Sequence, residues 1–175
     1  RAKLFVMLGT AEDHHSNPLK VAIAKFKRDG GRFISINPIR TGYSAIADDW
    51  LPIKPGTDIA LLLAWMNVLV AENLYDREFV EAHGFGFDAF RAEIAGFTPE
   101  WAYPITTIEP ATIRETAREM ARHRPATLVH PGRHVTWYGD DAQRSRAIAL
   151  VNALRGNWGR EGGFYFPASF ALAKY

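Results

Sequence analysis

Along the chain, short continuous runs of apolar residues alternate with segments in which apolar residues recur every three or four positions. This alternation predicts strands that alternate with helices. Residues 3–8 (KLFVML) and 32–36 (RFISI) are short apolar runs bounded by turn-forming or polar residues, which is typical of buried parallel strands. Between these runs, apolar residues recur every three or four positions from Pro18 until Gly30, which predicts a helix with a defined start and stop. Strand, helix and strand in this order form the βαβ unit of a doubly wound sheet.

Later patterns predict five more helices and one more strand. The helices are expected over 58–72, 76–82 and 87–94, from residue 109 or 110 to about 121, and over 140–154, and the strand over 126–130. Residues 37–57 are interpreted as a long connection without a helix or strand of its own, a kind of connection that is usually functional. Residues 98–107 are interpreted as an aromatic, proline-containing loop.

This order of elements predicts an α/β fold of three layers, with helices on both faces of a doubly wound, mostly parallel, Rossmann-like sheet. The 175 residues suit one such domain, so residues 1–175 are expected to form a single unit. The segment 156–175 is rich in glycine and aromatic residues, and we expect it to pack on a neighbouring domain.

Composition narrows the class of protein. Hydrophobic residues make up 47% and charged residues 23%, which excludes a disordered chain. The net charge of +2 is only weak support for a nucleic-acid or membrane-surface role, and no nucleic-acid partner is expected. Cysteine is absent, so the chain has no thiolate ligand for zinc or an iron–sulfur cluster. No stretch approaches the ~18 consecutive apolar residues of a membrane helix. The first residue is Arg1, and we interpret the sequence as part of a longer chain without a targeting signal in view.

Ligands of doubly wound folds bind at the carboxyl ends of the strands, and three segments of this sequence follow predicted strands. The first begins with Gly9 and reads GTAEDHH, where backbone N–H groups before a helix can bind a phosphate. It lacks the G-x-G-x-x-G fingerprint, which disfavours an NAD oxidoreductase. His14 and His15 are neighbours in sequence and are interpreted as part of a polar loop or cap rather than as metal ligands.

The second segment contains two candidates, each with a plainer alternative. Asn37, Pro38 and Arg40 follow the strand where ribose hydroxyls are held in nucleotide-binding folds, but Asn-Pro is also a common turn. Pro55-Gly56-Thr57-Asp58 leads into a helix, and Thr57 or Asp58 can simply cap it. The functional alternative is that the Asp58 carboxylate accepts the parallel N1–H and N2–H₂ donors of guanine.

The third segment starts at Gly132 and reads GRHVTWYG. Arg133 can bind an oxyanion and His134 can exchange a proton, whereas the plainer interpretation is a solvated arginine and a histidine at the edge of the core.

Together these segments resemble the molybdopterin oxidoreductases of the dimethyl sulfoxide reductase family. The run INPIRTGYSAIADDWLPIKPGTDIALLLAWMNVLV is similar to that family's strand, Asp-Pro-Arg-type turn, Ala-Asp pair and Pro-Gly-Thr-Asp helix start. The closing run, WYGDDAQRSRAIALVNALRGNWGREGGFYFP, resembles its helix and its Leu-x-Gly-Asn-x-Gly-Arg-x-Gly-Gly turn, which falls on residues 154–163. The resemblance covers nearly the whole chain. Within the family, the run PGRHVTWYGDDAQRSRA is most similar to catalytic subunits of polysulfide, thiosulfate, tetrathionate and arsenate reductases.

The resemblance implies a bis(molybdopterin guanine dinucleotide) cofactor with molybdenum or tungsten. Its residue assignments are Gly9, Thr10 and Glu12 toward the diphosphate; Asn37, Pro38 and Arg40 toward ribose and phosphate; Gly56, Thr57 and Asp58 toward guanine; Gly132 toward the pterin; and Arg133 and His134 as catalytic residues. Arg133 would steer an anionic substrate, and His134 would donate a proton or bind the pterin. Two departures are Asn37, where the family has Asp, and a first loop without the family's Gly-x-Asn pattern.

The resemblance also implies what other parts of the chain contain. The protein ligand of the metal and the cysteines of a 4Fe-4S cluster would lie upstream of Arg1, so this segment by itself is not expected to be active. Expected partners are a small anionic substrate, an iron–sulfur electron-transfer subunit, and also a membrane-anchor subunit, with a periplasmic or membrane-associated location in a prokaryote. The alternative function is a non-catalytic purine-nucleotide-binding α/β module, because the same βαβ order and helix-start Asp58 would serve a nucleotide without molybdenum.

Overall fold

The structure, a computed structural model, describes residues 1–9, 18–40, 42–132 and 141–165. In chain order the elements are β1 (Leu4–Leu8), α1 (Pro18–Arg28), β2 (Arg32–Ile36), α2 (Tyr43–Ile46), β3 (Asp49–Leu51), α3 (Asp58–Ala71), α4 (Arg77–His83), α5 (Phe87–Ile94), α6 (Pro99–Thr106), α7 (Pro110–Arg122), β4 (Thr127–His130) and α8 (Asp141–Leu154).

The strands form one parallel sheet in the order β3-β2-β1-β4. Leu4 of β1 lies opposite Arg32 of β2 on one side and Thr127 of β4 on the other, so β1 is central. Every residue of β1 is buried, which explains its continuous apolar run. The chain builds outward from β1 to β3 and then crosses back to place β4 on the opposite side of β1. This reversal of strand order is the switch point at which doubly wound folds bind ligands.

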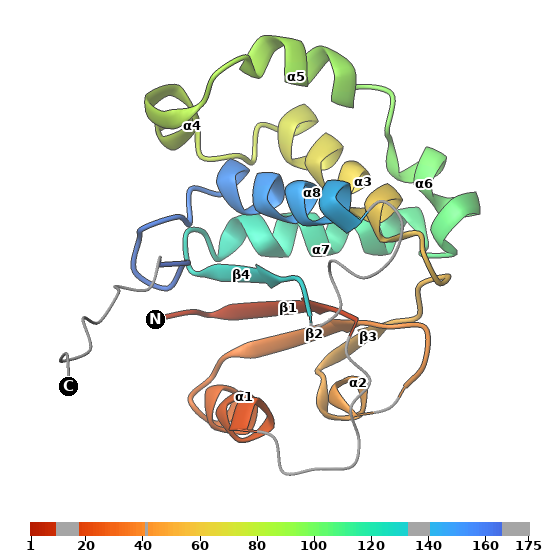
Figure 1. The fold of residues 1–175 in the computed structure, drawn as a ribbon, viewed down its shortest axis with the longest axis vertical. Coiled ribbons are helices and arrows are strands. Elements are labelled where there is room, and N and C mark those ends of the chain that lie inside the picture. Colours follow the sequence, from red (N-terminus) through yellow and green to blue (C-terminus); the bar gives the residue numbers. More distant parts are fainter. Residues whose placement is uncertain (10–17, 41, 133–140, 166–175) are drawn as a thin grey trace, which may run out of the picture.

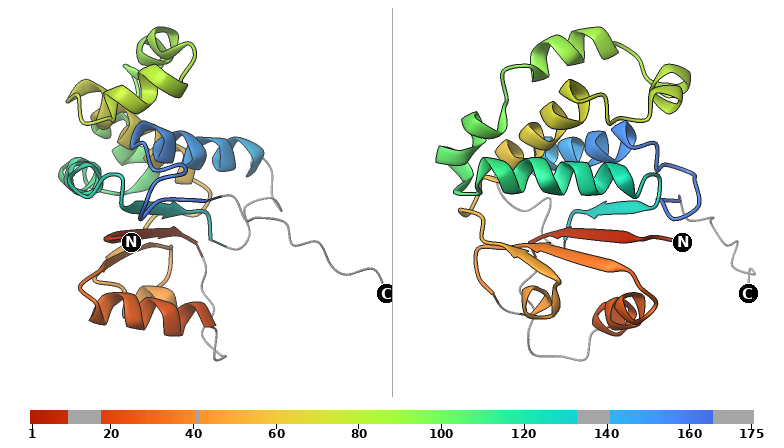
Figure 2. Two further views of the ribbon diagram at one scale, coloured as in Figure 1. Left: turned by 90° about the vertical axis from the view of Figure 1, so that its left-hand side faces the viewer. Right: turned by 180° about the vertical axis from the view of Figure 1, so that it is seen from behind.

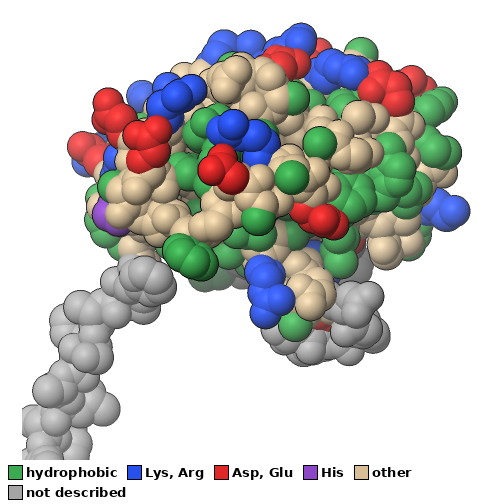
Figure 3. Space-filling model, turned by 90° about the horizontal axis from the view of Figure 1, so that it is seen from above, with side chains coloured by type: hydrophobic (Ala, Val, Ile, Leu, Met, Phe, Trp, Pro, Cys, Tyr) green, Lys and Arg blue, Asp and Glu red, His purple; other side chains and the backbone are tan. Residues whose placement is uncertain are grey.

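Helices cover both faces of the sheet, which confirms the predicted α/β class and its layers (Figures 1 and 2). Helices α1 and α2 lie on one face, and α3, α7 and α8 lie on the other, with α4, α5 and α6 outside them (Figure 1). The larger core cluster is on the α3 side, and a smaller one around Phe5, Phe33 and Tyr43 lies on the α1 side. Seen from the α4–α5 side, charges of both signs are interspersed with hydrophobic side chains (Figure 3).

Helix α3 lies inside the helical layer rather than on its surface. It packs against α6, α7 and α8, and most of its residues are buried, so its apolar positions run round the helix instead of forming one stripe. Its polar groups are satisfied internally: Trp65 donates from Nε1 to Thr116 Oγ1 at 2.8 Å, and Asn67 donates to the carbonyl of Ile94 at 3.0 Å.

Two expectations about connections were wrong. The segment 37–57 contains α2 and β3, which were hidden because one is a single turn and the other is a three-residue strand ended by Pro52. Residues 98–107 contain α6: the Thr98 hydroxyl accepts a hydrogen bond from the Trp101 N–H at 3.2 Å, and Pro99 occupies the first helical position. Proline is favoured there because that N–H has no partner inside the helix. The other predicted helices and strands are confirmed within two residues at each end where described.

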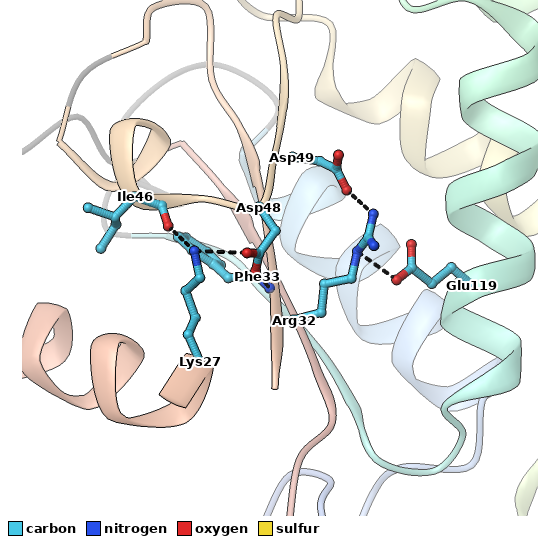
Figure 4. A network of polar contacts seen from close by, with 7 residues as sticks. All are labelled: Lys27, Arg32, Phe33, Ile46, Asp48, Asp49 and Glu119. Atoms are coloured by element: carbon cyan, nitrogen blue, oxygen red, sulfur yellow. Dashed lines mark hydrogen bonds and ion pairs between the residues drawn. The ribbon is translucent and has the colours of Figure 1, made fainter. Parts of the chain in front are cut away.

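A polar network ties the three layers together at the amino ends of β2 and β3 (Figure 4). Lys27 of α1 pairs with Asp48 at 2.9 Å, and Arg32 of β2 pairs both with Asp49 and, at 2.9 Å, with Glu119 of α7. Burial alone would raise the pKa of Asp48, but its hydrogen bonds from Lys27 and a backbone N–H outweigh that effect and hold the pKa below the usual value. Asp48 is therefore a structural residue at the edge opposite the predicted ligand site.

The outer edge of β4 is covered by asparagine amides. Asn152 of α8 accepts from the Val129 N–H at 3.1 Å and donates to the Val129 carbonyl at 2.9 Å, as a neighbouring strand would. Asn157 donates to the Thr127 carbonyl at 2.6 Å and to Asn152 Oδ1 at 2.7 Å. The Gly-Asn turn after α8 thus has a structural role, since it satisfies the backbone of an edge strand.

Candidate functional site

The predicted site residues that the structure describes lie along the carboxyl edge of the sheet. Gly9 follows β1, Asn37 follows β2, Asp58 begins the helix after β3, and Gly132 follows β4. Because all four strands are parallel, these positions share one edge, and β1 and β4 flank the switch point there. The structure therefore gathers segments that are far apart in sequence, as the sequence analysis expected.

Gly9 is required for its backbone conformation. Its φ is +67°, and its N–H donates to the Ile36 carbonyl at 2.8 Å. A Cβ at this position would meet no atom within 4 Å, so positive φ rather than crowding favours glycine. This amide extends the β1–β2 pairing, so a phosphate would have to take its N–H donors from later residues of the loop. Thr10 and Glu12 lie outside the described residues.

Asn37 joins β2 to β3. It is 3% exposed; its N–H donates to the Leu51 carbonyl at 3.2 Å, and its carbonyl accepts from Trp50 Nε1 at 2.7 Å. Its side-chain Oδ1 accepts from the Ile39 N–H at 3.2 Å, which is the Asn-Pro turn considered above. This turn fixes where Pro38 and Arg40 leave the sheet.

Pro38 and Arg40 are exposed beyond this turn. The Arg40 guanidinium lies 5.9 Å from the centre of the Trp50 ring, an arrangement that orients the cation while leaving its N–H groups available to an oxyanion.

The start of α3 differs from the plainer interpretation, because Thr57 makes no side-chain cap there. Gly56 has φ +77° in the turn before the helix, and the Thr57 hydroxyl donates to the Lys54 carbonyl at 2.7 Å instead of capping the helix. Asp58, 13% exposed, lies 3.5 Å from Arg144 of α8, measured from Oδ2 to Nη1. Its carboxylate is thus directed to the neighbouring helix, and a carboxylate in this place can accept a pair of N–H donors.

At the end of β4, the structure describes Gly132 but not Arg133 or His134. Gly132 has φ +72°, and its N–H donates to His130 Nδ1 at 3.1 Å. Burial lowers the pKa of His130, whose ring also packs against Phe5. Because Nδ1 accepts a hydrogen bond, the neutral ring with its proton on Nε2 is the form that fits this site.

Sequence reasoning missed Arg144 and His130. Asp141 and Arg144 have the i, i+3 spacing of a helical ion pair, which was a signal for contact within α8. The contact with Asp58 depends on the packing of α8 against α3, which no local pattern reveals. His130 is the last residue of a predicted strand before Pro-Gly, but its spacing gives no sign that it would accept from the backbone.

The described residues lack two kinds of feature. Within them, no three histidine or acidic side chains come together as potential metal ligands. Among the helices of this part of the chain, none has both the length and the apolar character needed to cross a membrane.

Comparisons with known proteins agree on one family. The family model for molybdopterin oxidoreductases matches residues 1–172. A sulfite dehydrogenase subunit of Allochromatium vinosum is 33% identical, over 97% of this chain and 27% of its own length. The molybdopterin-containing subunit of the thiosulfate reductase of Salmonella typhimurium is 37% identical, over 78% of this chain and 18% of its own length.

A solved structure shares the fold. Acetylene hydratase from Pelobacter acetylenicus matches with a TM-score of 0.79 and 26% sequence identity, over 92% of this chain and 22% of that chain. This chain therefore spans between 18% and 27% of the length of these relatives.

Proposed function

The chain belongs to the molybdopterin oxidoreductase family, and on that premise we propose that it holds the guanine nucleotide end of a bis(molybdopterin guanine dinucleotide) cofactor. In this proposal residues 1–175 are one nucleotide-binding domain of a longer oxidoreductase chain, and the segment from residue 156 packs on a neighbouring domain. When bound, the cofactor supplies the redox chemistry of its molybdenum or tungsten, while the protein supplies binding and orientation.

The residues along the carboxyl edge fit a nucleotide. The exposed Arg40, oriented by Trp50, can pair with a phosphate. Pro38, which follows the turn at Asn37, would lie beside the ribose. Two loops lead into helix N-termini, where anions are favoured. One begins at Gly9 and precedes α1, and the other ends at Asp58, the first residue of α3. Gly56 and Thr57 shape the turn that presents Asp58 to guanine, and Gly132 continues toward the pterin. Thr10 and Glu12 are assigned to the diphosphate.

Asp58 carries the proposal. It is a largely buried carboxylate at the first position of a 14-residue helix, at the carboxyl edge of the sheet, and its Oδ2 faces Arg144 of α8. Guanine offers two parallel N–H donors to such a group, and hydrogen bonds to a charged acceptor are the stronger kind.

We propose that the whole enzyme is a reductase of a sulfur or arsenic oxyanion. Two relatives are subunits of a sulfite dehydrogenase and of a thiosulfate reductase, which supports the sulfur compounds. Arg133 would pair with the anion through its planar fork, and His134 would supply a proton or hydrogen-bond the pterin.

Other components follow from the same proposal. Both of these relatives are subunits by name, which supports an assembly with other subunits. We propose that these include an iron–sulfur electron-transfer subunit and a membrane-anchor subunit, and that the assembly is periplasmic or membrane-associated in a prokaryote. A 4Fe-4S cluster and the protein ligand of the metal would lie in other parts of the catalytic chain.

The test is Asp58→Asn in the full-length protein, expressed in a host that makes the cofactor. We expect weaker cofactor retention by about tenfold or more, because charge-assisted hydrogen bonds of about 1.5–3 kcal/mol are lost. The measurements are molybdenum and tungsten by elemental analysis and GMP released by acid hydrolysis. Asp88→Asn, at an exposed first-turn aspartate of α5, is the matched control.

Full metal and GMP content in the Asp58→Asn protein would remove the guanine assignment. A wild-type protein that binds GMP but contains neither metal would favour the non-catalytic nucleotide-binding module instead.

A further inference from the structure

Arg144 is the partner of the Asp58 carboxylate. It lies in the first half of α8, is 20% exposed, and places Nη1 3.5 Å from Asp58 Oδ2. In the part of the chain that the structure describes, it is the one cation within ion-pair distance of Asp58. Thr57, the residue before α3, makes no side-chain cap.

Asp141 holds Arg144 from the other side. Its Oδ1 lies 3.1 Å from Arg144 Nη2, and the residue is 8% exposed at the first position of α8. A guanidinium has five N–H donors in a fixed plane, so one arginine can bridge two carboxylates without turning. Asp141, Arg144 and Asp58 thus form a chain of charges that links the N-termini of α8 and α3.

This chain orients Asp58 without saturating it. The 3.5 Å separation is longer than the 2.7–3.2 Å of an ordinary N–H···O hydrogen bond, and it involves Oδ2 only. An ionised carboxylate has about four lone-pair sites, so capacity remains for two further donors.

We infer that Arg144 is a positioning residue for base recognition: held by Asp141, it fixes the direction of the Asp58 carboxylate so that this carboxylate accepts both N–H donors of guanine. The inference rests on the proposed function of Asp58 and extends it to selectivity. A carboxylate held in one orientation gains binding free energy from both parallel N–H donors of a base. A carboxylate that is free to rotate gains less from the second donor. Arg144 therefore sets the preference for guanine over hypoxanthine, which lacks the N2 amino group.

The test uses the full-length protein purified without cofactor from cells that cannot make molybdopterin, with GDP and IDP as probes. Affinity is measured by isothermal calorimetry, and the unliganded melting temperature is recorded for every variant. Arg144→Gln should weaken GDP binding by about tenfold and bring the GDP and IDP affinities close together. Arg144→Lys should restore part of the selectivity, since it keeps the charge but not the planar fork.

The matched control is Arg146→Gln, which removes an exposed arginine of the same helix that bonds to Gln143. It should leave both affinities at the wild-type values. The unliganded Arg144→Gln protein should melt at a lower temperature than the Arg146→Gln protein, because two largely buried carboxylates lose their cation. The readout for the positioning role is therefore the ratio of the GDP and IDP affinities, which a merely structural role would not change.

The outcomes separate the inference from the proposed function. Wild-type selectivity in Arg144→Gln, together with lost selectivity in Asp58→Asn, would overturn the role of Arg144 and keep the guanine site. An equal loss of GDP and IDP affinity in Arg144→Gln, whatever its melting temperature, would reduce Arg144 to a structural residue. No GDP binding by the wild-type protein would overturn the guanine site and this inference with it.

Discussion

His130, the last residue of β4, should make the stability of the fold depend on pH. Burial lowers its pKa from the usual value of 6.5, so between these two pKa values the unfolded chain binds more protons than the folded one. The free energy of unfolding should therefore decrease as the pH falls through 6.5 toward the lower, folded-state pKa. Protonation would also remove the acceptor used by the Gly132 N–H.

The expected result is that His130→Asn flattens this dependence, because an amide oxygen can still accept from Gly132 but does not titrate. Urea unfolding between pH 5 and 7.5 measures the slope, with His83→Asn at an exposed position of α4 as the comparison. If the wild type and His130→Asn lose stability in parallel over this range, another group is responsible.

Single residues also mark the limit of prediction from the sequence. Asp58 could be placed at a helix start because Pro-Gly-Thr-Asp is a local signal, and Asn37 could be placed after a strand for the same reason. Their partners could not be foreseen. Arg144 reaches Asp58, and Trp50 reaches the Asn37 carbonyl, through packing that no spacing in the sequence encodes. The assignments of Thr10, Glu12, Arg133 and His134 remain predictions.

For helices and strands, length decided which were predictable. The long amphipathic helix α7 and the apolar β1 carry enough periodic positions to identify them, whereas the three-residue β3 does not. Helix α6 was obscured by its two prolines, although Thr98-Pro99 is itself a helix-start signal.

The edge of β4 gives a prediction about one element. Asn152→Ala leaves the Val129 N–H and carbonyl without their side-chain partner, and each buried unsatisfied group costs about 1–3 kcal/mol. We therefore expect the free energy of unfolding to fall by about 3 kcal/mol in urea. Gln143→Ala, at an exposed position of the same helix, should change it by less than about 0.5 kcal/mol. Equal small effects would mean that water replaces the amide at this edge.

Across the sheet and its helical layers, the free energy of local unfolding should decrease from the centre of the sheet outward. β1 is paired on both sides and buried throughout, whereas Ile94 is the one buried residue of α5. Hydrogen exchange followed by mass spectrometry should find the slowest amides in β1 and much faster exchange in α4 and α5. Protection of α5 equal to that of β1 in the full-length protein would show that another domain covers this helix.

The strand order could be expected only in outline from the sequence. A doubly wound sheet requires the strand order to reverse at some point. The sequence does not show that β4, which follows the five helices from α3 to α7, returns to pair with β1. The three-layer character followed from the alternation of strands and helices, while the amide-covered edge and the polar network at the opposite end did not.

The central place of β1 has a consequence for how the protein is made. Its partner β4 is synthesised roughly 120 residues later, which at about 5–20 residues per second is a delay of roughly 6 to 24 seconds on the ribosome. Throughout that interval the nascent chain can pair β1 with β2 but must leave the other side of β1 open, with a full set of backbone donors and acceptors. Among the four described strands, the one synthesised earliest must therefore wait for the last before both of its sides are paired, and a chaperone that shields β1 has that whole interval in which to act.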